Sequence, residues 1–289
     1  LIGAPNVGKS TLVNQLVGAK VSIVTHKVQT TRARVRGVLT EGSVQIVLVD
    51  TPGIFVPRRR LDRAMVEAAW AGAQDADIVV FIVDAAKGLD DDGDRILERL
   101  KDVRRPVVLL LNKIDLIKKD KLLALVAQLH ETGAFAETFM ISALAGDGVA
   151  DLKGYLARTV PEGPWLFPED DLSDLPMRML AAEITREKLY LRLHQELPYA
   201  STIETTAWKQ LRDGSARIEQ TIFVERPSQK QIVLGKGGRT IKAISSEARE
   251  ELKEIVGTDV HLFLFVKVRE NWGDDPERFR EMGLDFPSG

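Results

Sequence analysis

The 289-residue sequence contains no cysteine, so it forms no disulfides and offers no thiolate for catalysis or metal binding. It also lacks an apolar run long enough to cross a bilayer, and it opens with no signal-peptide pattern. Lys and Arg number 40 against 42 Asp and Glu, so no overall charge attracts the chain to nucleic acid. A length of 289 residues predicts two domains. The absences favour a cytoplasmic protein in which any nucleic-acid binding comes from a local patch.

Short apolar runs alternate with amphipathic stretches from residue 1 to about 160, which predicts a parallel sheet flanked by helices. Leu1 and Ile2 read as the end of a truncated first strand. The other predicted strands are 38–39, 44–49, 78–83, 107–111 and 139–141. Each run ends at a polar cluster. Ligands of open α/β sheets bind beyond the carboxyl ends of the strands, so we expect the chemistry there.

A proline-rich, acidic stretch at 161–176 interrupts the helical pattern and predicts a linker. Beyond it, residues 177–289 predict an α+β domain with a different order of elements. That order is a helix over 177–197, two strands around the turn at Asp213, a helix pair split at 235–238, and a last strand over 260–268. The sequence therefore predicts two domains of different architecture, at 1–160 and 177–289.

A glycine-bracketed loop follows the first apolar residues and precedes an amphipathic run, which is the context that a phosphate-binding loop requires. In such a loop the main-chain N–H groups and a helix N-terminus face the phosphates, Lys9 neutralises charge, and Ser10 offers a hydroxyl to Mg²⁺. A chance loop is the alternative for this motif taken alone. The candidate nucleotide-binding residues here are Gly3, Ala4, Pro5, Asn6, Val7, Gly8, Lys9, Ser10 and Thr11.

Three further motifs follow predicted strands. Asp50 can hold Mg²⁺ through water, and Gly53 can donate its N–H to the γ-phosphate. Asp115 can accept two hydrogen bonds from guanine, whereas adenine would leave this carboxylate unpaired. The order of the motifs therefore favours a guanine nucleotide over ATP, although an ATP-driven enzyme stays the alternative. The candidate residues are Asp50, Thr51, Pro52, Gly53, Asn112, Lys113, Asp115, Ser142, Ala143 and Leu144.

With these motifs, residues 1–160 resemble translation-factor-like GTPases of the Era and MnmE type. The resemblance makes residues 29–32 the first switch, with Thr31 capping Mg²⁺ and Thr30 as the second choice. It implies catalytic roles for Lys9, Thr31 and Gly53, and Mg²⁺ bound by Ser10, Thr31 and, through water, Asp50. Small signalling GTPases have a water-orienting glutamine where this chain has Ile54, so we expect slow hydrolysis. Asn6 matches an asparagine that binds potassium in the MnmE type; a loop-stabilising role is equally open.

The second domain has glycines around a basic residue, between a short and a longer predicted helix. This pattern resembles the clamp of a KH module, in which a sugar–phosphate backbone lies against the glycines. Residues 176–269 hold 16 Lys and Arg against 12 Asp and Glu, a small excess, so base contacts should contribute to affinity. A plain helix–helix turn is the alternative. The candidate RNA-binding residues are Ile232, Gly235, Lys236, Gly237, Gly238, Arg239 and Lys242.

Segments 175–176, 182–188, 195–199 and 265–270, with Trp272, extend the resemblance to one family across the chain. They are similar to the Era family, of the TrmE-Era-EngA-like class. The predicted fold is an α/β P-loop NTPase, with a mostly parallel sheet and helices on both faces, followed by an α+β type II KH domain. The resemblance implies a GTPase, expected to be monomeric, that binds small-subunit ribosomal RNA near its 3′ end, assists assembly of that subunit and associates in part with the inner membrane. A GTP-regulated adaptor whose C-terminal domain binds protein or membrane is the alternative.

Overall fold

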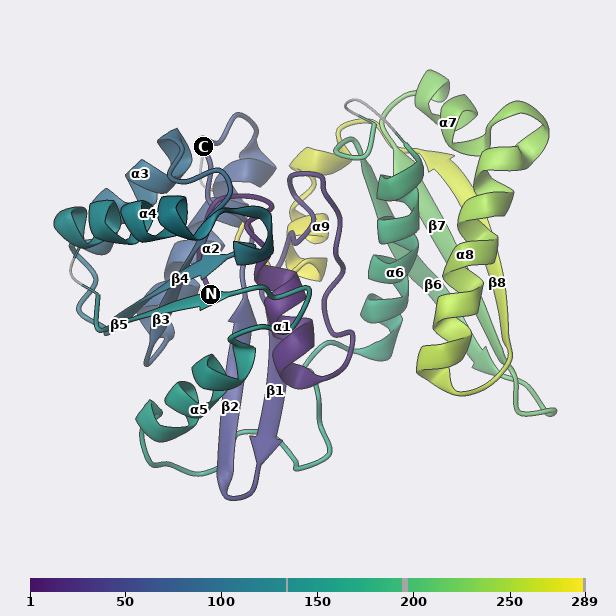
Figure 1. Ribbon diagram of the computed structural model, residues 1–289. Helices are drawn as coiled ribbons and strands as arrows, with labels where there is room; N and C mark the ends of the chain where they lie inside the picture. Colours follow the sequence, from purple (N-terminus) through teal and green to yellow (C-terminus); the bar gives the residue numbers. More distant parts are fainter. Residues whose placement is uncertain (134, 194–196, 288–289) are drawn as a thin grey trace. The chain divides into compact units, whose positions relative to one another are not determined.

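The computed structural model describes residues 1–133, 135–193 and 197–287, which divide into two compact units. The first unit is Leu1–Asp174 together with Phe279–Gly289, and the second is Leu175–Arg278. Their boundary at residue 174 falls inside the predicted linker at 161–176. Figure 1 labels the helices and strands of each unit.

The first unit contains a parallel sheet of β3 (Val79–Asp84), β4 (Val107–Asn112) and β5 (Glu137–Ile141), in that order. All residues of β3 and β4 are buried, as their continuous apolar runs predict. The helices of this unit are α1 (Lys9–Val17), α2 (Arg60–Asp75), α3 (Asp91–Leu100), the 3₁₀ turn η1 (Ile114–Leu116), α4 (Lys119–Thr132) and α5 (Val149–Thr159).

An antiparallel hairpin of β1 (Val35–Glu41) and β2 (Val44–Asp50) accompanies this sheet. Leu1 and Ile2 lie in space between β2 and β3. The Leu1 amino group donates to Val49 O at 2.9 Å, while the Ile2 N–H donates to Val80 O, also at 2.9 Å. These bonds place Gly3, the first residue of the glycine-bracketed loop, at the carboxyl end of the sheet.

Helices cover both faces of the β3–β4–β5 sheet, because successive strand residues point to opposite sides. Phe81 and Leu109 pack into a cluster with residues of α2, α3 and α4. Ile82 and Leu110 pack into a second cluster with α1 and α5. The predicted α/β architecture with helices on both faces is therefore confirmed.

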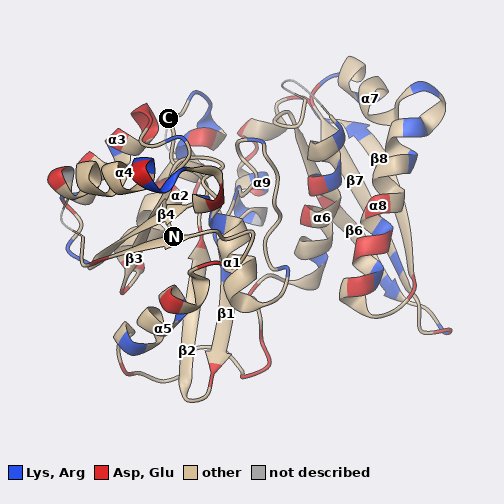
Figure 2. Cartoon of the chain, viewed as in Figure 1, with Lys and Arg blue, Asp and Glu red and all other residues tan. Residues whose placement is uncertain are grey.

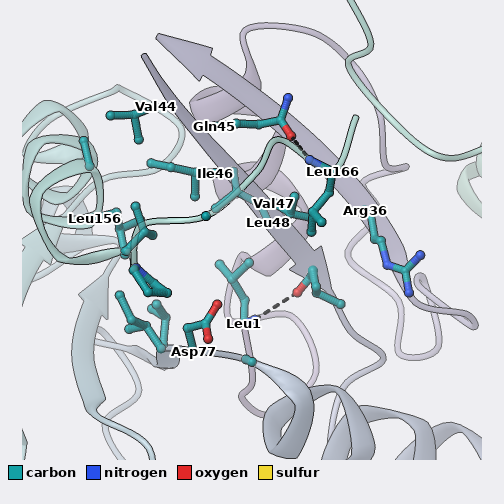
Figure 3. Close-up of a pocket in the computed structure, with 18 of the residues that line it drawn as sticks. Leu1, Arg36, Val44, Gln45, Ile46, Val47, Leu48, Asp77, Leu156 and Leu166 are labelled. Carbon is teal, nitrogen blue, oxygen red and sulfur yellow. Dashed lines mark hydrogen bonds between the residues drawn. The ribbon is translucent and has the colours of Figure 1, made fainter. Parts of the chain in front are cut away.

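A cleft of about 1000 Å³ opens between β2 and β3, and its lining includes residues 161–167 (Figure 3). Gln45 of β2 holds this segment: its Oε1 accepts from the main-chain N–H groups of Leu166 (2.9 Å) and Phe167 (3.0 Å), and its Nε2 donates to Phe167 O (2.9 Å). Further along, the Val38 N–H donates to Leu172 O at 2.9 Å. The predicted linker is thus bonded along the β1–β2 hairpin through much of its length.

The second unit follows the predicted order of helix, two strands, helix, turn, helix and strand. Its sheet has the order β6-β7-β8, with β8 parallel to β7. The first helix ends at Arg192, earlier than the predicted Leu197, and residues 194–196 lie outside the described residues. The elements are α6 (Met177–Arg192), β6 (Ser201–Gln210), β7 (Ala216–Val224), α7 (Pro227–Leu234), η2 (Lys236–Gly238), α8 (Arg239–Val256), β8 (Val260–Val268), η3 (Trp272–Asp274) and α9 (Pro276–Glu281), which reaches past the unit boundary.

Helices α6 and α8 pack on one face of this sheet (Figure 1). Ile244, Ala248 and Leu252 of α8 are fully buried there, as the helical spacing of apolar residues predicts. Tyr190 of α6 and Val233 of α7 extend the same core. Throughout the described part of the chain, no helix is both long and apolar enough to cross a membrane.

Candidate functional sites

The loop from Gly3 to Ser10 leads from Ile2 into α1, and two of its glycines are required by close approaches. A Cβ on Gly3 would lie 2.5 Å from Ile82 O, and one on Gly8 would lie 2.2 Å from Asn112 Nδ2. Gly8 also has φ +103°, which L-residues with side chains rarely adopt. The loop is therefore held tightly against the ends of β3 and β4, while its main chain turns around the N-terminus of α1.

Lys9 lies inside this loop, with 6% of its surface exposed. Its Nζ donates to Gly3 O at 3.2 Å and to Ala4 O at 3.0 Å. Burial lowers the pKa of Lys9 to about 8, although the Asp50 carboxylate works in the opposite direction. Phosphate oxygens beside Nζ would stabilise its charged form. The positive charge of Lys9 is only partly compensated within the protein, so it is available to bind an anion.

Asp50, the last residue of β2, is fully buried and gathers three hydroxyl groups around one carboxylate oxygen. Its Oδ2 accepts from Ser10 Oγ (2.6 Å), Ser22 Oγ (2.6 Å) and Thr31 Oγ1 (3.2 Å). Its Oδ1 is buried and has no hydrogen-bond partner among the described residues. Hard oxygen donors with a spare carboxylate lone pair are what Mg²⁺ prefers.

The structure therefore brings the three predicted magnesium residues together, and Ser10 Oγ lies 2.9 Å from Thr31 Oγ1. Thr30 is bonded elsewhere, because its Oγ1 contacts Thr25 Oγ1 at 2.6 Å and donates to Lys27 O at 2.7 Å. Of the two threonines considered, Thr31 is the one in contact with Asp50. Ser22 was not predicted, since no motif marks it and only the fold brings it to Asp50.

The segment after Asp50 packs against the phosphate loop. Thr51 Oγ1 donates to Leu1 O at 2.6 Å, and the Ile54 N–H donates to Gly3 O at 3.1 Å. A Cβ on Gly53 would lie 2.9 Å from Pro5 Cα, so only glycine fits this approach. The Ile54 side chain is buried in the core beside Ile2. It points away from solvent and, being apolar, cannot orient a water molecule.

Asn112, at the end of β4, joins three parts of the predicted nucleotide site. Its Nδ2 donates to Val7 O at 2.7 Å, and its Oδ1 accepts from Lys113 N (2.8 Å) and Ala143 N (2.9 Å). The Ala143 N–H is thus occupied by Asn112. Leu144, the next residue, is 85% exposed. Asn112 therefore positions the loops around a base site.

Lys113 links the phosphate loop to the end of β3. Its Nζ donates to Asn6 O and to Asp84 Oδ2, both at 2.7 Å. Asp84 belongs to none of the predicted motifs, although it ends a buried strand, where polar residues are expected to contribute to a site. Asp115 is exposed in η1, so its carboxylate is accessible to a base. The predicted guanine-contacting residues thus surround one edge of the sheet.

In the second unit, the turn between α7 and α8 carries the predicted RNA-binding residues. Gly235, Gly237 and Gly238 all have positive φ, and a Cβ on either of the last two would meet open space. The exposed basic residues Lys236, Arg239 and Lys242 lie at this turn and in the first turn of α8, while acidic residues follow further along that helix (Figure 2). Ile232 is 56% exposed at the end of α7. An open glycine turn with basic side chains can hold a sugar–phosphate backbone.

A phosphate loop, a hydroxyl-rich carboxylate and a base-site motif at one sheet edge, joined to a unit with a glycine turn between helices, define a P-loop GTPase with a KH domain. Two family models match the chain: the 50S ribosome-binding GTPase family over residues 1–113, and the KH domain family over residues 196–273. The chain belongs to the Era family of GTPases, because it is similar to Era proteins over nearly its whole length.

GTPase Era of Afipia carboxidovorans is 67% identical over 287 residues, which cover 99% of this chain and 93% of the relative. GTPase Era of Rhizobium meliloti is likewise 67% identical, with 99% of this chain and 92% of the relative covered. The crystal structure of Era with MgGDPNP and nucleotides 1506–1542 of 16S ribosomal RNA is 39% identical, with a TM-score of 0.93 over 98% of this chain and 96% of that one. An Aquifex aeolicus Era variant bound to GDP and AlF₄⁻ has the same identity, TM-score and coverage.

Proposed function

We propose that this GTPase uses GTP binding and slow hydrolysis to control its grip on small-subunit ribosomal RNA near the 3′ end, and that it acts in assembly of that subunit in the cytoplasm. The observation that carries the proposal is the open glycine turn with Lys236, Arg239 and Lys242 in a chain that also holds a guanine-nucleotide site. The solved Era complex with a fragment of 16S ribosomal RNA supports the choice of RNA.

In the proposed nucleotide site, Lys9 neutralises the β- and γ-phosphates, and Gly53 donates its N–H to the γ-phosphate. Mg²⁺ would be held by Ser10, Thr31 and, through water, Asp50, and it would supply positive charge that stabilises the phosphates. Asp115 reads guanine by two hydrogen bonds. The remaining positions of the loop, from Gly3 to Thr11, supply main-chain donors and shape. The three clustered oxygen groups and the MgGDPNP in the solved Era complex support this assignment.

Hydrolysis has no water-orienting side chain at Ile54, so we propose that another group assists it. Potassium near Asn6 is one candidate, because this residue lies in the phosphate loop and its side-chain oxygen is a hard donor of the kind that such cations take. GTP turnover should then be faster in potassium chloride than in sodium chloride at equal ionic strength, and Asn6→Ala should remove that difference. Equal rates in the two salts would remove potassium from the proposal.

The monomeric state and a partial association with the inner membrane stay predictions.

The coupling between GTP and RNA is tested by the RNA affinity of the full chain with GDP and with a non-hydrolysable GTP analogue. We expect tighter binding with the analogue, because order in the two switches depends on the γ-phosphate. Equal affinities would refute the coupling, while leaving the two binding sites in place.

The adaptor alternative is tested by changing both Lys236 and Gly237 to aspartate. Both substitutions have room, because Lys236 is exposed and a Cβ on Gly237 would meet open space. Negative charge in the turn repels phosphate, so RNA binding should disappear. The unfolding midpoint should fall only slightly, because aspartate tolerates the φ of +62° at Gly237 better than most residues do. The control is Lys253→Asp, which changes the charge by −2 rather than −3 at the far end of α8 and breaks one exposed ion pair, with Asp259. Retained RNA binding by the turn variant would favour a protein or membrane partner.

A further inference from the structure

The sheet of the second unit has one face covered by α6 and α8 and a second face with exposed aromatic side chains. Along β8, Val260, Leu262 and Val266 are buried on the helix side. The alternate residues point to the other side. Of these, Phe263 is 43% exposed and Phe265 is 48% exposed. The side of the sheet opposite α6 and α8, with these two rings on β8, is here called the open sheet face.

Basic residues flank the two rings. Arg217 of β7 points to the same face, and its guanidinium lies 4.7 Å from the centroid of the Phe263 ring. Lys209 of β6 is paired with Arg217 in the sheet register, and Lys267 is the next exposed residue of β8 on this face. No carboxylate among the described residues lies within ion-pair distance of either lysine. The open sheet face therefore has cations beside both rings.

The acidic residues of this face are already paired. Glu219 accepts from Arg217 Nη2 at 2.8 Å, and Glu204 accepts from Arg278 Nη1 at 2.8 Å. Arg278 also lies over the ring of Phe223, at 4.8 Å from its centroid, and this third ring is less exposed than Phe263 and Phe265. What remains for a ligand is the exposed surface of Phe263 and Phe265 and the positive charge of Lys209 and Lys267.

This combination fits a single RNA strand better than a protein. Side chains two residues apart on one strand are separated by about 6.6 Å, so two neighbouring bases can each stack on a ring. Lysines beside the rings can neutralise the phosphates between those bases. The cores of protein–protein interfaces, by contrast, are depleted of charged residues.

We propose that the open sheet face binds single-stranded RNA by stacking bases on Phe263 and Phe265, with Lys209 and Lys267 contacting phosphates. This second site is separate from the glycine turn, because the turn lies among the helices that cover the other face. Strand β8 is at the edge of the sheet. One RNA strand held at the turn can therefore pass around this edge and reach both rings. The inference rests on RNA binding by the second unit, as proposed above.

The test compares two double variants of the full chain, Phe263→Leu with Phe265→Leu and Phe263→Tyr with Phe265→Tyr. Leucine keeps apolar bulk but has no π-face, whereas tyrosine keeps the ring. The probes are a uridine oligomer of about six nucleotides, close to the four that a glycine turn clamps, and one about four times longer. The leucine variant should bind the long oligomer at least about fivefold more weakly for each ring lost. It should bind the short one normally, and the tyrosine variant should match the wild type with both.

Ultraviolet crosslinking of the long oligomer to the wild type should also mark the peptide with Phe263 and Phe265, in addition to the glycine turn. Unchanged affinity of the leucine variant for the long oligomer would overturn the inference alone, whereas a wild type that binds neither oligomer would overturn the proposed function first. If the leucine variant keeps its affinity for both oligomers but no longer binds the small ribosomal subunit, the open sheet face binds a protein and the inference is wrong. Unfolding curves and GTP turnover of both variants should match the wild type.

Discussion

Substitutions at two residues of one motif should have different effects: loss of the Asn112 side chain should lower stability, and loss of the Asp115 side chain should lower nucleotide affinity. Asn112 is 2% exposed and makes hydrogen bonds of 2.7, 2.8 and 2.9 Å to Val7, Lys113 and Ala143. Asn112→Ala leaves the Val7 carbonyl and the Ala143 N–H buried without a partner. Each such loss costs about 1–3 kcal/mol, so the first unit should lose about 2–6 kcal/mol of its free energy of unfolding.

Asp115→Ala is the matched control, because the Asp115 side chain is exposed in η1. A surface change of this kind alters stability by within about 0.5 kcal/mol. In the proposed site, the change removes two hydrogen bonds from guanine to a charged acceptor, each contributing about 1.5–3 kcal/mol, so GDP affinity should fall at least about a hundredfold. Asn112→Ala should weaken GDP binding as well, through displaced loops.

The assay is urea unfolding of the full chain with and without GDP, since a ligand shifts the transition of the unit that binds it. Calorimetric titration with GDP supplies the affinities. A first-unit transition unchanged by Asn112→Ala would refute the reasoning that this side chain holds the site together. So would an Asp115→Ala variant that is destabilised as much as Asn112→Ala.

Three more outcomes are expected. Phosphates should raise the pKa of Lys9 from about 8, so GDP binding should take up a proton and weaken as pH rises past that value; buffer-independent binding heats would contradict this. Gly235→Ala should destabilise the second unit by at least about 1 kcal/mol, because φ is +72° and the new Cβ would meet Thr240 Oγ1 at 2.2 Å; an unchanged unfolding midpoint would exclude it. Gln45→Ala should speed proteolytic cutting within 161–174, since three hydrogen bonds to that segment are lost; equal cutting rates would argue against the clamp.

The nucleotide motifs could be predicted because each is short and follows a buried strand whose apolar run is visible in the sequence. Asp50 and Asn112 needed only their position at a strand's carboxyl end. The helix and strand order of the second unit was predicted for the same reason, and 260–268 matches β8 in full. Local pattern and position in the sheet carry this information.

Contacts that arise only when distant segments meet could not be predicted. Ser22 reaches Asp50 across 28 residues, and Gln45 bonds to Leu166 across 121. Neither serine nor glutamine has a pattern that marks such a role. The early end of α6 at Arg192 is a similar case, since the apolar spacing continues past it. The Leu193 N–H still donates to Leu189 O at 2.9 Å, but Leu193 itself has extended backbone angles.

The central claim is that this chain binds guanine nucleotides through the loop at Gly3 to Ser10 and the Asn112 motif. Calorimetric titration of the full chain with GDP and with ADP, each with magnesium, tests it most directly. We expect one GDP bound per chain and no measurable heat with ADP. Equal binding of the two nucleotides, or heat with neither, would contradict the account.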